Sequence, residues 1–99
     1  MTSSAQTAAA PIIAIEPSRA KTVSGREVRW YRIPHDRVLT QAPSRTHKVE
    51  AKIERFSDTL WIVRIVEALG AGGTKDMPSL EAAEDYWRTW MERRTERRW

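Results

Sequence analysis

The chain has 99 residues, a net charge of +4 and a pI of about 10.0, and its length suits one domain with a modest core. It contains no cysteine, which excludes disulfides, thiolate metal sites and thiol nucleophiles. The mean hydropathy is −0.60 and no apolar run approaches the roughly 18 residues of a spanning helix, so no membrane segment is expected.

Residues 1–22 are predicted to be a disordered or loosely attached tail, followed by a single domain over 23–99. Residues 1–10 are mainly Ser, Thr, Ala and Gln, a composition that does not support a packed core. The short apolar run Ile12–Ile15 either stays loose, adds an edge strand to the sheet or docks on a partner. Residues 1–10 hold no basic residue, so no secretory signal is expected and the predicted compartment is the cytoplasm.

Two segments in the middle of the chain have strand character. Arg26–Ile33 is rich in β-branched and aromatic residues and stops at Pro34. Within it, Val28 and Trp30 are expected to face the core. Lys48–Phe56 alternates between apolar and charged residues, which predicts a half-buried antiparallel strand.

A turn at Ser57–Thr59 joins this strand to Leu60–Ala68, the most apolar run of the chain. The two strands form a hairpin in a register that brings their apolar residues onto one face, because a one-residue slip would separate them. The expected opposite pairs are Phe56 with Leu60, Ile53 with Val63, and Ala51 with Ile65.

The rest of the chain is predicted to hold two connections, a short strand and a helix. Residues 34–46 and 70–75 read as a loop and a flexible glycine connection, and Lys75–Met77 as a short strand. Ser79 is a good N-cap for a helix from about Leu80 to Arg94 or beyond. Acidic residues come early in this helix and basic ones late, which suits the helix dipole. Its apolar face consists of Leu80, Ala83, Trp87, Trp90 and Met91.

The predicted fold is therefore α+β, with a small antiparallel sheet of three or four strands packed against one C-terminal helix. Apolar residues on the inward faces of these elements form the expected core. They are Val49, Ala51, Ile53, Trp61, Val63, Ile65, Leu80, Ala83, Trp87 and Trp90, with Val28 and Trp30.

The sequence offers little that resembles a catalytic or metal site. His35 and His47 stand apart in the sequence and no cysteine accompanies them, so a metal site is not expected. Glu50 and Glu54 alternate with lysines on an outward face, whereas acid–base chemistry needs a carboxylate that is buried or placed beside a like charge. The glycine segment lacks the spacing of a phosphate-binding loop. We expect no enzyme activity, no catalytic residue and no cofactor.

A binding function fits the distribution of charge better. The whole surplus lies in residues 1–46, where seven basic residues accompany three acids. In the arm at Arg26–Arg37, arginines interleave with Trp30 and Tyr31, and this pattern suits phosphate contacts combined with base stacking. The alternative is an ordinary outer strand with solvated arginines. The candidate binding residues are Arg26, Arg29, Trp30, Tyr31, Arg32, Arg37, Lys48, Lys52, Arg64 and Trp99.

The stretch Lys48–Trp90 resembles the three-stranded-sheet-plus-helix DNA-binding domains of phage integrase arms and plant ethylene-response factors. The matching features are a tryptophan-bearing strand at Leu60–Ile65, a glycine turn at Gly72–Thr74 and a helix that opens Ser79–Ala83. The resemblance implies that the exposed sheet face reads a DNA major groove. Since acids alternate with lysines on that face here, the arm at Arg26–Arg37 is the better candidate.

Two functional hypotheses follow. The first is a small basic module whose partner is nucleic acid or a nucleic-acid-bound protein complex. The second is a protein-interaction module, such as an adaptor or a phage or mobile-element inhibitor of the anti-CRISPR kind that docks on a host complex. An exposed edge strand also allows two copies to pair as a homodimer. No membrane partner is expected.

Overall fold

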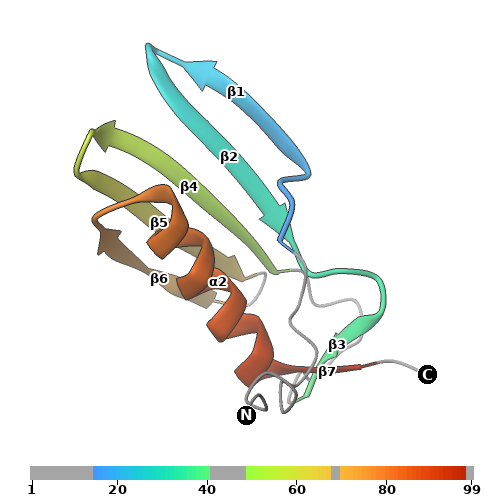
Figure 1. The fold of residues 1–99 in the computed structure, drawn as a ribbon. Helices are drawn as coiled ribbons and strands as arrows, with labels where there is room; N and C mark the ends of the chain where they lie inside the picture. Colours follow the sequence, from blue (N-terminus) through green and yellow to red (C-terminus); the bar gives the residue numbers. More distant parts are fainter. Residues whose placement is uncertain (1–14, 41–48, 68–69, 98–99) are drawn as a thin grey trace, which may run out of the picture.

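The computed structural model describes residues 15–40, 49–67 and 70–97, which form an α+β fold (Figure 1). The main sheet is antiparallel, with five strands in the order β1-β2-β4-β5-β6, and a second sheet pairs β3 with β7. The prediction of an α+β fold with an antiparallel sheet is confirmed, although the sheet has more strands than expected. The elements are β1 (Arg19–Val23), β2 (Arg26–Arg32), β3 (Arg37–Leu39), β4 (Val49–Ser57), β5 (Leu60–Glu67), β6 (Gly70–Met77), α2 (Leu80–Arg94) and β7 (Thr95–Arg97).

The first hairpin pairs β1 with β2 around a two-residue turn. Ser24 and Gly25 both have positive φ, 53° and 80°, as the tight turns that match the twist of paired strands require. The backbone N–H of Ser18 donates to the Trp30 carbonyl over 2.7 Å and prolongs this pairing. The sheet therefore begins at Arg19, ahead of the boundary at residue 23. Ile15 packs partly buried against the core, and residues 12–14 lie outside the described part of the chain.

The hairpin of β4 and β5 has the predicted register along most of its length. Ile53 pairs with Val63, and Ala51 pairs with Ile65. The closing pair differs from the prediction, because an irregularity after Arg55 makes Ser57, and not Phe56, the partner of Leu60. A bulge of this kind leaves one residue unpaired and bends the strand.

Strands extend into two segments that were expected to be connections: residues 70–74, ahead of the predicted strand Lys75–Met77, and residues 37–39. Gly70–Met77 pairs along its length with β5, with one irregularity opposite Ile65 and Val66 and a positive φ of 108° at Gly73. Arg37–Leu39 pairs with β7, which directly follows the helix. Every residue except proline carries a backbone N–H and C=O that can join a ladder, so the glycines of β6 remove side-chain signals without preventing pairing.

The helix α2 begins and ends as the sequence predicts. The Ser79 hydroxyl accepts a hydrogen bond from the backbone N–H of Ala82 over 3.1 Å, which caps the first turn. The helix ends at Arg94, where Thr95 adopts extended backbone and donates its hydroxyl to the Met91 carbonyl. This change of conformation directs the chain into β7.

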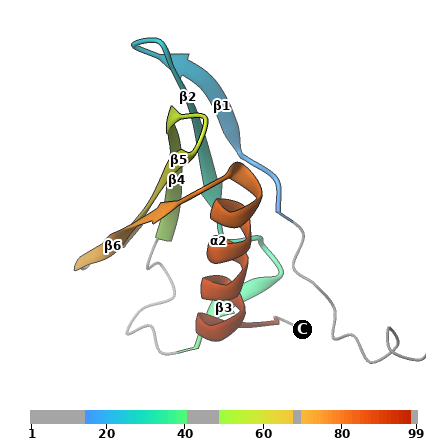
Figure 2. The same cartoon turned by 60° about the vertical axis from the view of Figure 1, so that its left-hand side comes forward.

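The helix covers one face of the sheet (Figure 1, Figure 2), where it contacts β4, β5 and β6. The prediction for Trp30 is wrong, because Tyr31 and not Trp30 faces the helix. Val28 is buried as predicted, but it lies on the face of the sheet opposite the helix. Pairing of β2 with β4 sets Tyr31 opposite buried Ala51 and Trp30 opposite Lys52. The buried cluster consists of Tyr31, Val49, Ala51, Ile53, Trp61, Val63, Ile65, Ala83, Trp87 and Met91, with Leu80 and Trp90 partly buried beside it.

Among the residues described, no helix is both long enough and apolar enough to cross a membrane.

Candidate functional site

The face of the main sheet opposite α2 is the candidate functional site, and we call it the open face. Strand residues alternate between the two faces, so the residues between those packed toward α2 belong to it, among them Val28, which is buried on this side. None of the described elements packs on it (Figure 2). Its side chains are therefore those that a ligand would meet first.

One line of side chains across the open face contains no acid. The strand registers place Arg19 opposite Trp30, Trp30 opposite Lys52, Lys52 opposite Arg64, and Arg64 opposite Thr74. These five residues, one from each strand, form what we call the cationic row. Adjacent strands lie about 4.8 Å apart, so the row spans about 19 Å of the sheet.

The aromatic member of the row is covered on one side by cations. The Arg19 guanidinium lies 4.0 Å from the centroid of the Trp30 ring, and the Lys21 ammonium lies 5.8 Å from it. Such contacts hold a cation beside the ring without neutralising it. Within the described part of the chain, neither Arg19 nor Arg64 forms an ion pair with a carboxylate, so both keep their full charge for a ligand.

Two flanking rows lie on either side of the cationic row and mix acids, bases and apolar residues. Their acids are partly neutralised: Glu54 pairs with Arg26 at 3.3 Å and with Lys52 at 3.7 Å, and Glu50 pairs with Arg32 at 3.9 Å. The first row contains Lys21, the buried Val28, Glu54, Ile62 and Asp76, and the second contains Arg32, Glu50 and Val66.

A shallow hollow of about 140 Å³ opens at the β1 end of the cationic row. The hollow contains an aromatic ring, two guanidinium groups, a hydroxyl and a carboxylate. An aromatic anion could therefore stack on the ring, place its negative charge beside a guanidinium and hydrogen-bond to the polar groups. Its lining residues are Ser18, Arg19, Trp30, Arg32 and Glu50.

The predicted binding residues divide between the two faces of the sheet. Trp30, Lys52 and Arg64 belong to the cationic row, and Arg26 and Arg32 lie beside it on the open face. Pairing of β2 with β4 and of β4 with β5 thus brings together binding residues from three segments of the sequence.

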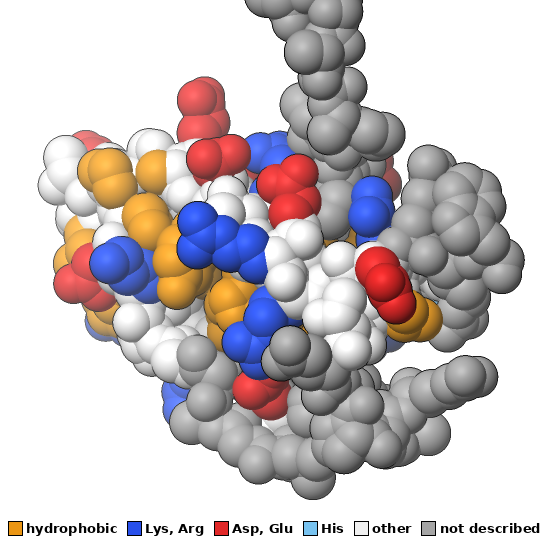
Figure 3. All heavy atoms as spheres, turned by 90° about the horizontal axis from the view of Figure 1, so that it is seen from below, with side chains coloured by type: hydrophobic (Ala, Val, Ile, Leu, Met, Phe, Trp, Pro, Cys, Tyr) orange, Lys and Arg blue, Asp and Glu red, His pale blue; other side chains and the backbone are white. Residues whose placement is uncertain are grey.

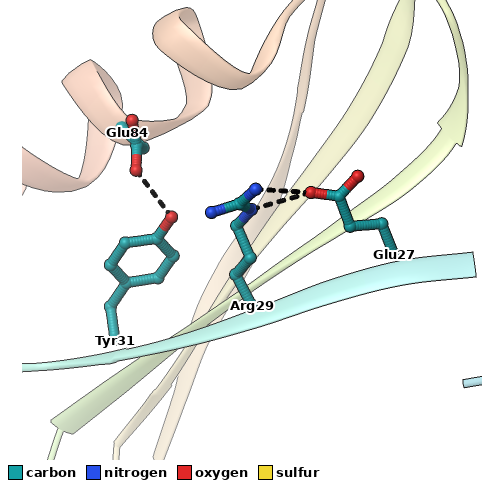
Figure 4. Close-up of polar contacts among 4 residues, drawn as sticks. All are labelled: Glu27, Arg29, Tyr31 and Glu84. Atoms are coloured by element: carbon teal, nitrogen blue, oxygen red, sulfur yellow. Dashed lines mark hydrogen bonds and ion pairs between the residues drawn. The ribbon is translucent and has the colours of Figure 1, made fainter. Parts of the chain in front are cut away.

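Arg29 and Tyr31 point instead toward the helix (Figure 4). The Tyr31 hydroxyl donates to a Glu84 carboxylate oxygen over 2.8 Å, and Arg29 donates twice to Glu27, over 2.9 and 2.6 Å. Burial, followed by the hydrogen bond to Glu84, raises the pKa of Tyr31 well above its ordinary value. The hydrogen bond to Glu27 raises the pKa of Arg29. These contacts fasten β2 to the covered side, and a ligand on the open face would not touch them.

The remaining predicted residues lie elsewhere. Arg37 is in β3, away from the main sheet, and its Nε is buried without a hydrogen-bond partner among the described atoms. Lys48 and Trp99 lie outside the described residues.

Sequence reasoning missed three open-face residues: Arg19, Lys21 and Thr74. The first two were assigned to the tail and the third to a glycine connection. The dipeptide Ser24–Gly25, a frequent turn signal, would have indicated a hairpin and so a strand before Arg26. Thr74 had no comparable signal, because it precedes the predicted strand Lys75–Met77 and joins the sheet only through its pairing with β5.

A second hollow, of about 220 Å³, lies on α2 and is lined by Tyr86, Thr89, Trp90, Arg93 and Arg94. The Arg94 guanidinium covers the Trp90 ring at 4.9 Å and also pairs with Glu67 at 3.2 Å. At the end of the molecule near β3 and β7, basic side chains stand among acidic and hydrophobic ones (Figure 3). One of the two arginines that line this hollow is therefore already paired with a carboxylate, and the hollow lies on the helix, apart from the cationic row.

Comparisons with known proteins give no further guide: no family model, curated protein or solved structure matches the chain. Among the described residues, no group of three or more His, Asp or Glu side chains is placed to hold a metal ion.

Proposed function

We propose that this protein is a non-enzymatic module that binds nucleic acid through the open face of its sheet. The observation that carries the proposal is the cationic row: three cations, a tryptophan and a threonine in one line across five strands. Phosphates attract the cations, the ring offers a stacking surface and the hydroxyl can donate to a phosphate oxygen.

The charge balance of the open face supports the same conclusion. Three acids lie on it, and Glu50 and Glu54 are already paired with neighbouring cations. The basic side chains on this face are more numerous, so a surplus of positive charge remains to attract a polyanion. They are Arg19, Lys21, Arg26, Arg32, Lys52 and Arg64.

Titration of a fluorescent mixed-sequence oligonucleotide, followed by anisotropy at several salt concentrations, tests the proposal. We expect the logarithm of the affinity to fall linearly with the logarithm of salt, because bound phosphates release counterions. The double variant Arg19→Gln, Arg64→Gln removes two cations of the row. It should weaken binding about tenfold or more and reduce the salt slope by about one to two.

The matched control is Lys75→Gln, Arg93→Gln, which removes the same charge elsewhere. Lys75 pairs with Val63, so it shares the covered side of the sheet, and Arg93 is exposed on α2. Binding by the control should stay within about twofold of the wild type, since neither side chain lies on the open face where the ligand is proposed to bind. Equal losses in both variants, or no binding by the wild type at low salt, would overturn the proposal.

A second candidate is a protein-interaction module, and the exposed apolar residues of the sheet favour it. Val23, Phe56 and Val66 are 41%, 42% and 50% exposed. A pull-down with tagged protein, divided into nuclease-treated and untreated halves, separates the two candidates. A partner protein that persists after nuclease treatment, and is lost on Val66→Ser, would support this second function in place of the first.

A further inference from the structure

We infer that the ligand is a single strand of nucleic acid, bound with its phosphates along the cationic row and with a base stacked on Trp30. This inference rests on the proposed function and narrows its substrate class. It depends on the width of the row, the chemistry of the flanking rows and the hollow beside Trp30.

The cationic row is only one residue wide. Side chains of one face repeat every second residue along a strand, so each flanking row lies about 6.6 Å from it. Glu54 and Asp76 lie in one flanking row and Glu50 in the other. A duplex presents two phosphate backbones to one face of a protein, and only one of them can follow a row that is one residue wide. The other would lie off the row, on a part of the face that holds carboxylates, which repel phosphate.

A single strand does not meet this obstacle, because its bases and not a second line of phosphates lie over the flanking rows. Ile62 and half-exposed Val66 offer apolar contact to base faces. Carboxylates can accept hydrogen bonds from the amino groups of cytosine and adenine, which are not paired in a single strand. The acids that disfavour a duplex are therefore compatible with this ligand.

The hollow at the β1 end of the row supplies the place for the stacked base. Trp30 forms part of its lining, with Arg19 and Arg32 as cations and Glu50 as a hydrogen-bond acceptor. The guanidinium that now lies 4.0 Å over the ring belongs to an exposed side chain. A base can replace it on the ring while the guanidinium moves to the adjacent phosphate, and both groups keep a favourable partner.

The test compares one sequence in three forms: single-stranded DNA, single-stranded RNA and a DNA hairpin duplex. We expect single strands to bind at least about tenfold more tightly than the duplex at the same salt concentration. The DNA and RNA arms identify which single strand is preferred. Trp30→Leu should weaken single-strand binding about 5- to 150-fold, the range for one stacked base, and leave the salt slope unchanged.

Two further variants separate stacking from folding and from charge. Trp90→Leu removes a half-buried tryptophan from α2 and should leave binding unchanged, once circular dichroism shows that both variants are folded. Arg64→Gln should instead reduce the single-strand salt slope by about 0.7, as loss of one phosphate contact does.

The outcomes distinguish this inference from the proposed function. Binding to the duplex as tight as to single strands, or unchanged binding by folded Trp30→Leu, would overturn the inference and leave a nucleic-acid-binding module. Failure of all three ligands to bind would remove the proposed function itself.

Discussion

The two faces of the β4–β5 hairpin are built from the same two strands, but they differ in the burial and the charge of their side chains. On the covered face, Ile53 and Val63 are fully buried beneath α2. On the open face, their sequence neighbours Lys52 and Arg64 lie opposite each other in the register of the same two strands, and both side chains are in contact with solvent. Because side chains alternate along a strand, a residue that stabilises the fold and a residue that is available to a ligand can be direct neighbours in the sequence.

This separation has a consequence for the sheet as a whole. A one-layer sheet with a helix on one side needs polar residues on the other to stay soluble, and charges of mixed sign would meet that need. The cationic row goes beyond it, because acids are confined to the flanking rows. The arrangement of charge, rather than its amount, distinguishes the open face from an ordinary solvated surface.

The largest expected effect compares neighbours on opposite faces. Ile53→Ala removes a fully buried side chain and should lower the free energy of unfolding by about 2–5 kcal/mol. Lys52→Ala, one position away, should change it by less than about 0.5 kcal/mol but weaken oligonucleotide binding. Urea unfolding and anisotropy measure the two quantities. Similar stability losses in the two variants would show that the open face is not the solvated side.

The features predictable from sequence are those with a strong repeating pattern. The alternation of residues 48–56 with the apolar run from Leu60 gave both the register and the inward faces. The Ser79 cap and the spacing of apolar residues gave α2. Each signal lies within one segment and is reinforced by burial of one whole face.

The features missed depend on pairing between segments. In Arg26–Arg32, both faces carry an aromatic residue, so alternation alone does not tell which one is inward. The choice is made by pairing with β4, which sets Tyr31 beside Ala51. The cationic row is less predictable still, because its residues come from five strands, of which β1 was not recognised and β6 was recognised only over Lys75–Met77. Residues that form a row across a sheet are far apart in the sequence, so no local sequence pattern predicts the row.

The second prediction concerns the contact that ties β2 to the covered face. Tyr31→Phe keeps the buried ring but removes the donor to Glu84, and it should cost about 1–2 kcal/mol, since a partly buried carboxylate loses its partner. The pKa of Tyr31 is raised in the folded protein, so the unfolded chain ionises first as pH rises. The wild type should therefore lose stability above about pH 10.

Urea unfolding of both proteins between pH 7 and about pH 12 checks this sign. The stability difference between wild type and Tyr31→Phe should be full below about pH 10 and shrink above it. Oligonucleotide binding at neutral pH should be unchanged, because the hydroxyl lies on the covered side. A difference that grows with pH would contradict the proposed role of the Tyr31–Glu84 hydrogen bond.

The third prediction weakens the covering helix without altering the sheet. Ser79→Ala removes the hydroxyl that accepts from Ala82 and should cost about 1 kcal/mol. Ser79→Asp restores an acceptor and adds a negative charge at the helix N-terminus, so it should recover that loss. Neither variant should change oligonucleotide affinity under conditions where the protein is folded. A change in affinity would mean that the helix contributes to the ligand site.

The last prediction concerns an acid of the open face, where a small loss of stability is expected together with a gain in binding. Glu54 pairs with Arg26 and Lys52, and exposed pairs contribute little, so Glu54→Gln should cost about 1 kcal/mol or less. The substitution also removes an acid beside the cationic row and releases two cations. Affinity for a single strand should rise several-fold at low salt, and the gain should vanish as salt screens the added charge.

Glu92→Gln, which removes an exposed acid from α2, is the matched control and should leave affinity unchanged. If Glu54→Gln binds no better than Glu92→Gln, phosphates do not lie along the row, and the difference between the two faces of the sheet is one of solvation alone.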